Sequence, residues 1–207
     1  MYGTLTFICG PMFSGKTTEL LKRILWAKNG QHTQIKVFKP AFDRRYAQLE
    51  IVSHEGLSVE AQAIYNWTTS IEYLIDQGVE CVFFDEVQFF CAPNFENDVM
   101  AIIRDLLSAG INVVASGLDM DWQGAPFEIS GQLAAMAEEM VKLKAICHVC
   151  GRPASRTYKK GGSQKQVEIG GTDLYQARCL LHWSRPDEKQ ASLFARFDSP
   201  RLIKLQH

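Results

Sequence analysis

The stretch GPMFSGKT, at residues 10–17, constrains the fold of this 207-residue chain more than any other feature. It matches the pattern G-x-x-x-x-G-K-[ST] without a gap. A β-branched and aromatic run, residues 4–9, precedes it, and apolar residues recur at helical spacing from residue 17 to about residue 28. This order predicts a strand, a loop whose backbone N–H groups bind phosphate oxygens, and a helix whose N-terminus adds positive charge. The alternative is a glycine-rich turn that carries a lysine by chance, and the flanking strand and helix argue against it.

The residue types within the loop predict separate roles. Lys16 is expected to reach the β- and γ-phosphates of a nucleotide, and the hydroxyl of Thr17 is expected to bind Mg²⁺. ATP with Mg²⁺ is therefore the expected cofactor. The remaining loop residues are expected to lie against the phosphates: Gly10, Pro11, Met12, Phe13, Ser14 and Gly15.

Apolar runs alternate with helical patterns over the next hundred residues. Strands are expected at 34–40, 81–85 and 111–117, and helices at 70–78 and 95–110. Such alternation implies right-handed crossovers and a parallel sheet with both faces covered. We therefore predict an α/β fold in which a P-loop (RecA-like) parallel sheet is flanked by helices.

Two neighbouring carboxylates, Asp85 and Glu86, end one of the apolar runs. Ligands of open α/β sheets bind beyond the carboxyl ends of the strands, so Asp85 is expected to point toward the metal on the nucleotide phosphates. If the strand continues as far as Glu86, this side chain is expected to face elsewhere, because neighbouring strand residues face opposite sides. It can accept a proton from water, as in an ATPase, or from a substrate hydroxyl, as in a kinase. The alternative is a solvated acidic turn.

Two phenylalanines, Phe89 and Phe90, follow the carboxylates and slightly favour the kinase. A kinase for a flat aromatic substrate can use an aromatic wall for stacking and for excluding water. An ATPase needs no such wall beside its base. Phenylalanines are also common core residues, so the pair alone does not decide between the two.

The pattern changes near residue 145, where cysteines, glycines and basic residues become frequent. Cys147-x-x-Cys150 and Cys179-x-x-His182 have the spacing of a tetrahedral Cys₃His zinc site, with 28 residues between the two pairs. Four ligands close the coordination shell, which predicts structural Zn²⁺. The alternative is four unrelated residues, and a reducing compartment argues against disulfides as the use of these cysteines.

The residues between the two pairs carry glycine pairs at both ends and few apolar anchors. They fit a lid that orders over a ligand, and they fit a disordered surface loop about equally well. We accordingly expect three parts: a nucleotide-binding α/β domain at 1–144, a small zinc-binding lasso or lid domain at 145–183, and a tail of unassigned role at 184–207.

Charge and hydropathy restrict the partners and the location. The formal net charge of −1 argues weakly against nucleic acid as the main partner. No apolar run approaches the roughly 18 residues of a membrane span, and the first residues lack the basic and small-residue segments of a signal peptide. We expect a cytoplasmic protein with no membrane partner.

Taken in order, GPMFSGKT, DEVQFF, the paired zinc ligands and IGGTDLY resemble the thymidine kinase family of the zinc-containing, tetrameric type. The resemblance extends over about residues 4–183. It implies transfer of the γ-phosphoryl group of ATP to the 5′-hydroxyl of thymidine, by a homotetramer. It also implies that Glu86 is the general base and that Asp85 lies on the metal side.

The same resemblance implies further contacts of the two substrates. Asp43, Arg45 and Gln88 are expected near the nucleotide phosphates and metal. A second set is expected around the thymine and deoxyribose: Met12, Phe89, Leu118, Trp122, Phe127, Thr157, Ile169, Gly170 and Tyr175.

Two other classes of protein share part of this pattern. A RecA-like motor ATPase that grips nucleic acid through its zinc module has the same loop and carboxylate pair, but it needs a basic groove that the near-neutral charge does not favour. A nucleotide-sensing or scaffold protein binds ATP without chemistry and leaves Glu86 without a role. Stimulation of ATP consumption by thymidine, and not by single-stranded DNA, distinguishes the kinase from the motor.

Overall fold

The computed structural model describes residues 2–30, 33–41, 50–52, 58–163, 165–166, 168 and 170–183. The expected sites at Asp43, Arg45 and Ile169 lie outside these residues, as does the tail at 184–207. Within the described ranges no helix has the length and apolar character that crossing a membrane requires.

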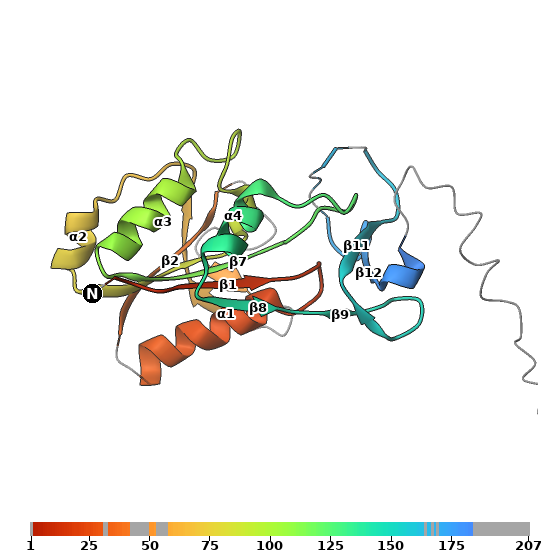
Figure 1. Ribbon diagram of the computed structural model, residues 1–207, viewed down its shortest axis with the longest axis horizontal. Helices are drawn as coiled ribbons and strands as arrows, with labels where there is room; N and C mark the ends of the chain where they lie inside the picture. Colours follow the sequence, from red (N-terminus) through yellow and green to blue (C-terminus); the bar gives the residue numbers. More distant parts are fainter. Residues whose placement is uncertain are drawn as a thin grey trace, which may run out of the picture.

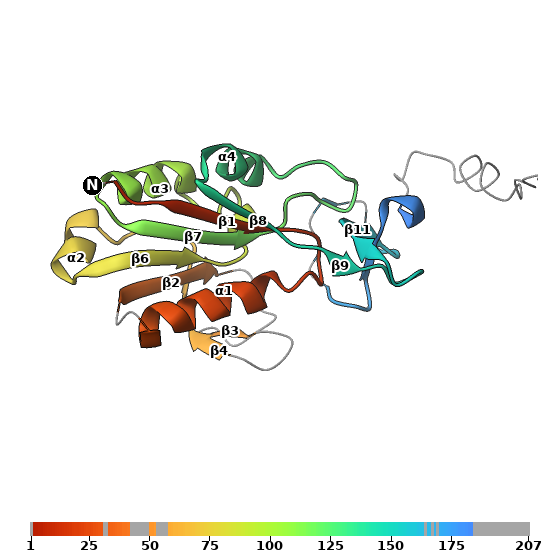
Figure 2. The same cartoon turned by 60° about the horizontal axis from the view of Figure 1, so that its bottom comes forward.

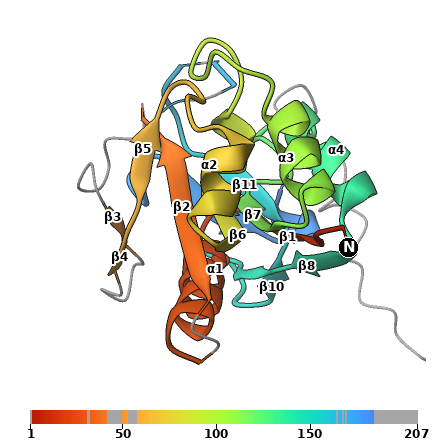
Figure 3. The same cartoon turned by 90° about the vertical axis from the view of Figure 1, so that its left-hand side faces the viewer.

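A six-stranded sheet forms the centre of the molecule, and every neighbouring pair of its strands is parallel. Viewed end on, the strands follow one another from β5 to β8 (Figure 3). In spatial order they are β5 (Gln62–Ile64), β2 (Gln34–Pro40), β6 (Val79–Phe84), β7 (Asn112–Gly117), β1 (Leu5–Cys9) and β8 (Glu139–Lys142). The predicted parallel α/β fold is thus confirmed.

Helices cover both faces of this sheet, as parallel strands require. One face carries α1 (Lys16–Leu25), which continues as a π-helical turn, η1 (Trp26–Gly30). The other face carries α2 (Ile71–Asp76), α3 (Val99–Ser108) and α4 (Glu128–Met136), as Figure 2 shows.

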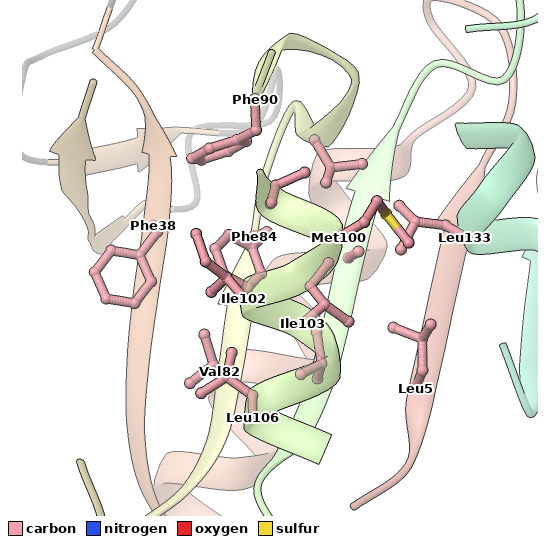
Figure 4. Packing of buried hydrophobic residues seen from close by; sticks show 14 of the residues in the cluster. Leu5, Phe38, Val82, Phe84, Phe90, Met100, Ile102, Ile103, Leu106 and Leu133 are labelled. Carbon is pink, nitrogen blue, oxygen red and sulfur yellow. The ribbon is translucent and has the colours of Figure 1, made fainter. Parts of the chain in front are cut away.

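The alternation of side chains along the strands divides the core into two clusters. On β6, Val82 and Phe84 belong to the cluster beneath α3, whereas Phe83 belongs to the cluster beneath α1. Figure 4 shows Ile103 and Leu106 of α3 lying over the first of these clusters. Both are fully buried, and truncating such a side chain to alanine typically costs about 2–5 kcal/mol of unfolding free energy.

Local signals account for the ends of the helices. Asp98 begins α3, because its Oδ1 accepts hydrogen bonds from the N–H groups of Met100 and Ala101 at 2.8 and 3.2 Å. Gly110, with a φ of 83°, follows its end. Ser70 begins α2 in the same way, its Oγ accepting from the N–H of Tyr73 at 3.1 Å.

The sequence patterns did not predict several short elements of the sheet domain, among them its two edge strands, β5 and β8. The helix α4 contains Ser130 and Gly131, which weaken a helical pattern, and the four residues of β8 are mostly exposed and show no strong strand pattern. β5, the opposite edge strand, has only three residues. An antiparallel pair, β3 (Glu50–Val52) and β4 (Ser58–Glu60), lies outside the main sheet.

Small antiparallel sheets stand beyond the carboxyl ends of the main strands (Figure 1). We call residues 145–183 the β9–η3 region. One sheet pairs β9 (Ala145–Ile146) with β10 (Pro153–Ala154), and the other pairs β11 (Arg156–Lys159) with β12 (Tyr175–Arg178), which leads to η3 (Leu180–His182). This region therefore lies at the end of the sheet where ligands of α/β proteins bind.

Candidate active site

The loop between β1 and α1 turns through three residues with positive φ: Gly10 at 148°, Phe13 at 65° and Gly15 at 82°. A side chain at Gly10 would place its Cβ 2.6 Å from the carbonyl oxygen of Leu143, so the position admits only glycine. Gly15 stands immediately before α1. The loop therefore leads directly into the N-terminus of α1, which is the arrangement of a phosphate-binding loop.

Lys16 begins α1 and turns back over the loop, where its ammonium group donates to the carbonyl oxygen of Pro11 at 2.8 Å. Burial lowers its pKa, and the charges of Glu86, Asp85 and Asp119 oppose that shift. The two predicted carboxylates from the β6 end thus act on the ammonium group of the loop, which brings the two motifs together in one site.

Asp85 follows β6 directly and is 7% exposed. Its N–H donates to the carbonyl oxygen of Phe38 at 2.9 Å, which ties the residue to the end of β2. Burial, and then the charge of Glu86, raise the pKa of this carboxyl well above its ordinary value, while Lys16 acts in the opposite direction. A divalent cation would favour the ionised form and offset the cost of burial.

Glu86 has a left-handed backbone, with φ 51° and ψ 41°. Strand alternation does not separate it from Asp85 as the sequence predicts, because β6 ends at Phe84. The left-handed turn into η2 (Val87–Phe89) sets its direction instead. A non-glycine residue in this conformation costs of order 1–3 kcal/mol, and residues strained in this way cluster at functional sites. Its Oε2 accepts a hydrogen bond from Nε2 of Gln88 at 2.6 Å.

The aromatic residues near this part of the sequence lie in different places. The rings of Phe89 and Phe127 meet edge to face with centroids 6.2 Å apart, and both residues are buried. Trp122, in the loop after β7, is also buried. Phe90 instead belongs to the core beneath α3, where it packs against Phe84 and Phe95.

The loop between β1 and α1 touches the β9–η3 region directly. The N–H of Met12 donates to Oγ1 of Thr157 at 3.1 Å, and the ring of Phe13 lies 5.7 Å from that of His148. Met12 and Thr157, both expected near the nucleoside, are thus in contact across the two parts of the chain. Leu118 belongs to the same site through Gln88, whose Oε1 accepts from its N–H at 2.9 Å.

The segment between β11 and β12 lies against the loop that follows β7. Nε1 of Trp122 donates to the carbonyl oxygen of Lys165 at 3.1 Å, and Gln166 donates to Asp121 at 3.0 Å. The hydroxyl of Tyr175 donates to the carbonyl oxygen of Glu168 at 2.8 Å. These contacts tie described residues of the segment to the loop after β7 and to β12.

Gly170, which is expected near the thymine, and its neighbour Gly171 end this segment. Gly170 is partly buried, and a Cβ there would lie 2.9 Å from the side chain of Leu174. The N–H of Gly171 donates to Oδ1 of Asp173 at 2.9 Å.

Lys159 anchors the segment, and the sequence did not predict this contact. Its ammonium group pairs with Glu168 at 2.6 Å, and it also lies 5.2 Å from the ring centroid of Trp122. The Lys159 side chain is only 2% exposed. The pairing lowers the pKa of Glu168 to about 2 through hydrogen bonds from Lys159 and then from Ser163. No local pattern marks a lysine as buried, so only the fold reveals this contact.

Trp183 is a second contact that the sequence did not predict. Its Nε1 donates to the carbonyl oxygens of Thr157 and Trp122, at 3.1 and 3.4 Å. Gly124 permits the close approach, because a Cβ there would lie 2.7 Å from the Trp183 ring. Its position directly after the last zinc-ligand candidate was the one available signal.

The four predicted metal ligands lie together. The donor atoms of Cys147, Cys150, Cys179 and His182 all fall within 4.8 Å of one another. Sγ of Cys150 and Sγ of Cys179 are 3.8 Å apart. A tetrahedral Zn²⁺ with Zn–S bonds of about 2.3 Å places two sulfur ligands about 3.8 Å apart, so the spacing fits this ion.

The surroundings of Cys147 also suit a metal thiolate. Burial opposes its ionisation, but hydrogen bonds from the backbone at Cys179, Val149 and Cys150 outweigh burial and lower the pKa of the thiol to about 5. The thiolate is the form that binds metal. The cluster can therefore hold a zinc ion with all four positions filled by protein.

Comparison with known proteins agrees with this arrangement. The sequence model of the thymidine kinase family matches residues 3–183. A thymidine kinase from Pseudothermotoga lettingae is 42% identical over 180 residues, which is 86% of this chain and 94% of that protein. Thymidine kinases from Bdellovibrio bacteriovorus and Thermococcus kodakarensis are 40% and 38% identical over 181 and 199 residues, which cover 87% and 90% of this chain and 85% and 96% of theirs.

Proposed function

This chain belongs to the thymidine kinase family, and we propose that it transfers the γ-phosphoryl group of ATP to the 5′-hydroxyl of thymidine. The observation that carries the proposal is the convergence of Lys16 with Asp85 and Glu86 beside the aromatic pair Phe89 and Phe127. Phosphoryl transfer needs a held triphosphate, and a base near the acceptor hydroxyl assists it. The aromatic pair supplies an apolar surface against which a flat nucleobase can pack.

We assign the nucleotide side of the reaction to the phosphate-binding loop and its neighbours. The loop amides and Lys16 hold the β- and γ-phosphates, and the Thr17 hydroxyl and Asp85 carboxylate hold Mg²⁺. Bound Mg²⁺ supplies neutralisation of the charge on the phosphates. Asp43 and Arg45 are proposed to lie on the same side.

We assign the proton transfer to Glu86. Its carboxylate accepts the 5′-hydroxyl proton of thymidine as the oxygen attacks the γ-phosphorus, and the ADP oxygen leaves on the opposite side. Because ATP and thymidine are bound with the reacting oxygen and phosphorus already aligned, little reorganisation is needed, and positioning supplies most of the rate acceleration.

The remaining candidates are proposed to hold the nucleoside. Aromatic and apolar side chains enclose the base and sugar, while the backbone near Ile169 and Gly170 contacts the base from the lid. The enclosing side chains are Met12, Phe89, Leu118, Trp122, Phe127, Thr157 and Tyr175.

Zn²⁺ is proposed at Cys147, Cys150, Cys179 and His182, where its role is structural because it closes the base of the lid. The chain then divides into a nucleotide-binding domain at 1–144 and a zinc-binding lid domain at 145–183. A cytoplasmic homotetramer without nucleic acid or membrane partners completes the proposal.

A panel of nucleosides incubated with labelled ATP and Mg²⁺ tests this function. Thymidine is expected to give a labelled 5′-monophosphate, and Lys16→Met is expected to abolish the product. Formation of free phosphate that single-stranded DNA stimulates, with no labelled nucleotide, would instead identify a nucleic-acid motor.

A further inference from the structure

Gln88 makes two hydrogen bonds that link Glu86 to the opposite wall of the site. The side chain is 2% exposed, and it extends from η2 toward the end of β7. Its Nε2 donates to Oε2 of Glu86 at 2.6 Å, and its Oε1 accepts from the N–H of Leu118 at 2.9 Å. It therefore bridges the proposed base and a residue proposed to contact the nucleoside.

The chemistry of the partners determines the orientation of this amide. The N–H of Leu118 can only donate, so it requires the oxygen of the Gln88 amide. The NH₂ group must then face Glu86, where an ionised carboxylate can only accept. Exchanging the oxygen and the NH₂ group of Gln88 would leave both hydrogen bonds unmade. The backbone N–H of Leu118 therefore sets which end of the Gln88 amide faces Glu86.

The Leu118 peptide is itself held from the other side. Its carbonyl oxygen accepts a hydrogen bond from Oγ of Ser130 at 2.6 Å, and Ser130 is 2% exposed on α4. Gly117 completes the arrangement, because a Cβ there would lie only 2.4 Å from Oε1 of Gln88. The path from α4 to Glu86 thus consists of short, partly buried hydrogen bonds.

We propose that Gln88 is a positioning residue for Glu86 rather than a ligand of ATP. Glu86 has a strained left-handed backbone, and Gln88 holds its carboxylate against the other conformations that this turn permits. Gln88 takes its own position from Leu118. Binding of the nucleoside against Leu118 is therefore coupled to the placement of the Glu86 carboxylate. The proposal rests on the proposed function, in which Glu86 removes the proton from thymidine.

A double-mutant cycle tests the proposal. Gln88→Met keeps the length of the side chain and removes both hydrogen-bonding ends. We expect kcat to fall on the order of 10- to 100-fold, as misplacement of a catalytic group does, with the Kd for ATP unchanged within about twofold. In a Glu86→Gln background the same change is expected to cost less than about threefold, because no base remains to be positioned.

Three outcomes would overturn the proposal. A weaker Kd for ATP with unchanged kcat would make Gln88 a nucleotide ligand, and a raised KM for thymidine alone would make it a contact of the nucleoside. Costs that multiply fully in the double mutant would show a structural role unrelated to the base. Ser130→Ala is expected to lower kcat by a smaller factor than Gln88→Met, because it loosens Leu118 and only indirectly Gln88.

Gln88→Glu supplies a second measurement if the methionine variant does not fold. One carboxylate oxygen can still accept from Leu118, but the other faces Glu86 as a like charge. Two carboxylates at hydrogen-bonding distance share a proton, so the acidic limb of the kcat/KM profile is expected to move up by about one pH unit or more. An unmoved limb contradicts the proposal. If the wild-type chain makes no thymidine monophosphate, the proposed function itself has failed.

Discussion

The phosphate-binding loop and the β9–η3 region meet at one end of the molecule, but different interactions hold them. The loop is fixed by the sheet: β1 pairs with β7 and β8 along its length, and the N–H of Leu143 donates to the carbonyl oxygen of Cys9 at 2.8 Å. The β9–η3 region has strands of two to four residues. Its buried apolar cluster consists of Ala145, Cys147, Ala154 and Ala177.

These four small side chains and the buried Tyr175 bury little apolar surface for a module of this size, so the cysteine and histidine cluster and side-chain bonds must supply the remainder. The difference matches two roles. Phosphoryl transfer requires groups fixed within fractions of an ångström, which a packed sheet provides. A lid must release its product, and a few polar contacts can open without unfolding the sheet.

The sharpest test of the fixed region is removal of its base. Glu86→Gln is expected to lower kcat by on the order of a hundredfold or more, the usual contribution of a general base. The Kd for ATP and the unfolding temperature should change little, since the amide has almost the same shape. Steady-state kinetics and thermal denaturation measure both, with Glu80→Gln, an exposed change at the other end of β6, as the control. Near-normal turnover would remove Glu86 from the mechanism.

Loss of a metal ligand should disrupt the β9–η3 region and leave the loop between β1 and α1 intact. Cys150→Ser is expected to release zinc and to raise the KM for thymidine about 10- to 100-fold, whereas the Kd for ATP should change much less. Metal analysis and proteolysis between β10 and β12 follow the loss of order. Cys91→Ser, at an exposed cysteine outside the cluster, is the matched control. Equal loss of ATP binding would mean that the loop depends on the cluster for its own shape.

Opening the lid contact alone should have a smaller effect. Glu168→Gln removes the charge that pairs with Lys159 and keeps most of the side-chain shape. The KM for thymidine is expected to rise about three- to tenfold with little change in kcat, as for a loss of binding that is equal in ground and transition states. Lys165→Met, at an exposed lid position, should leave both constants unchanged. A fall in kcat with constant KM would place the pair in the chemical step.

Acid should weaken the same contact in a predictable window. The pKa of Glu168 is lowered from 4.5 to about 2, by hydrogen bonds from Lys159 and then Ser163. A lowered pKa means that the pairing contributes fully above about pH 4.5 and is lost as the pH falls toward 2. Lid closure, followed by limited proteolysis, should therefore be constant above about pH 5 and decrease below it. The Glu168→Gln variant should lack that dependence, and an identical acid profile in both proteins would assign the change to another group.

Several features of the fold and site followed from local patterns. The loop at residues 10–17, the strand that leads into Asp85 and the two ligand pairs each depend on spacing within a few residues. The structure contains the loop and the strand, and it brings the four ligand candidates together. All four predicted strands are present, as β1, β2, β6 and β7, because a strand buried on both faces has a continuous apolar run. The short edge strands β5 and β8 lack that signal. The chain places β8 beside β1 only after it has formed the other five strands of the sheet.

The sequence alone thus determined which residue types this protein brings to the nucleotide and the metal, since glycine conformation and ligand spacing are local properties. Only the tertiary structure decided how those groups are held. The amide of Gln88 meets Leu118 30 residues away, Trp183 meets Trp122 61 residues away, and Lys159 is buried in contact with Glu168 and Trp122. Such contacts join segments that are distant along the chain, so their geometry depends on packing that no short pattern encodes.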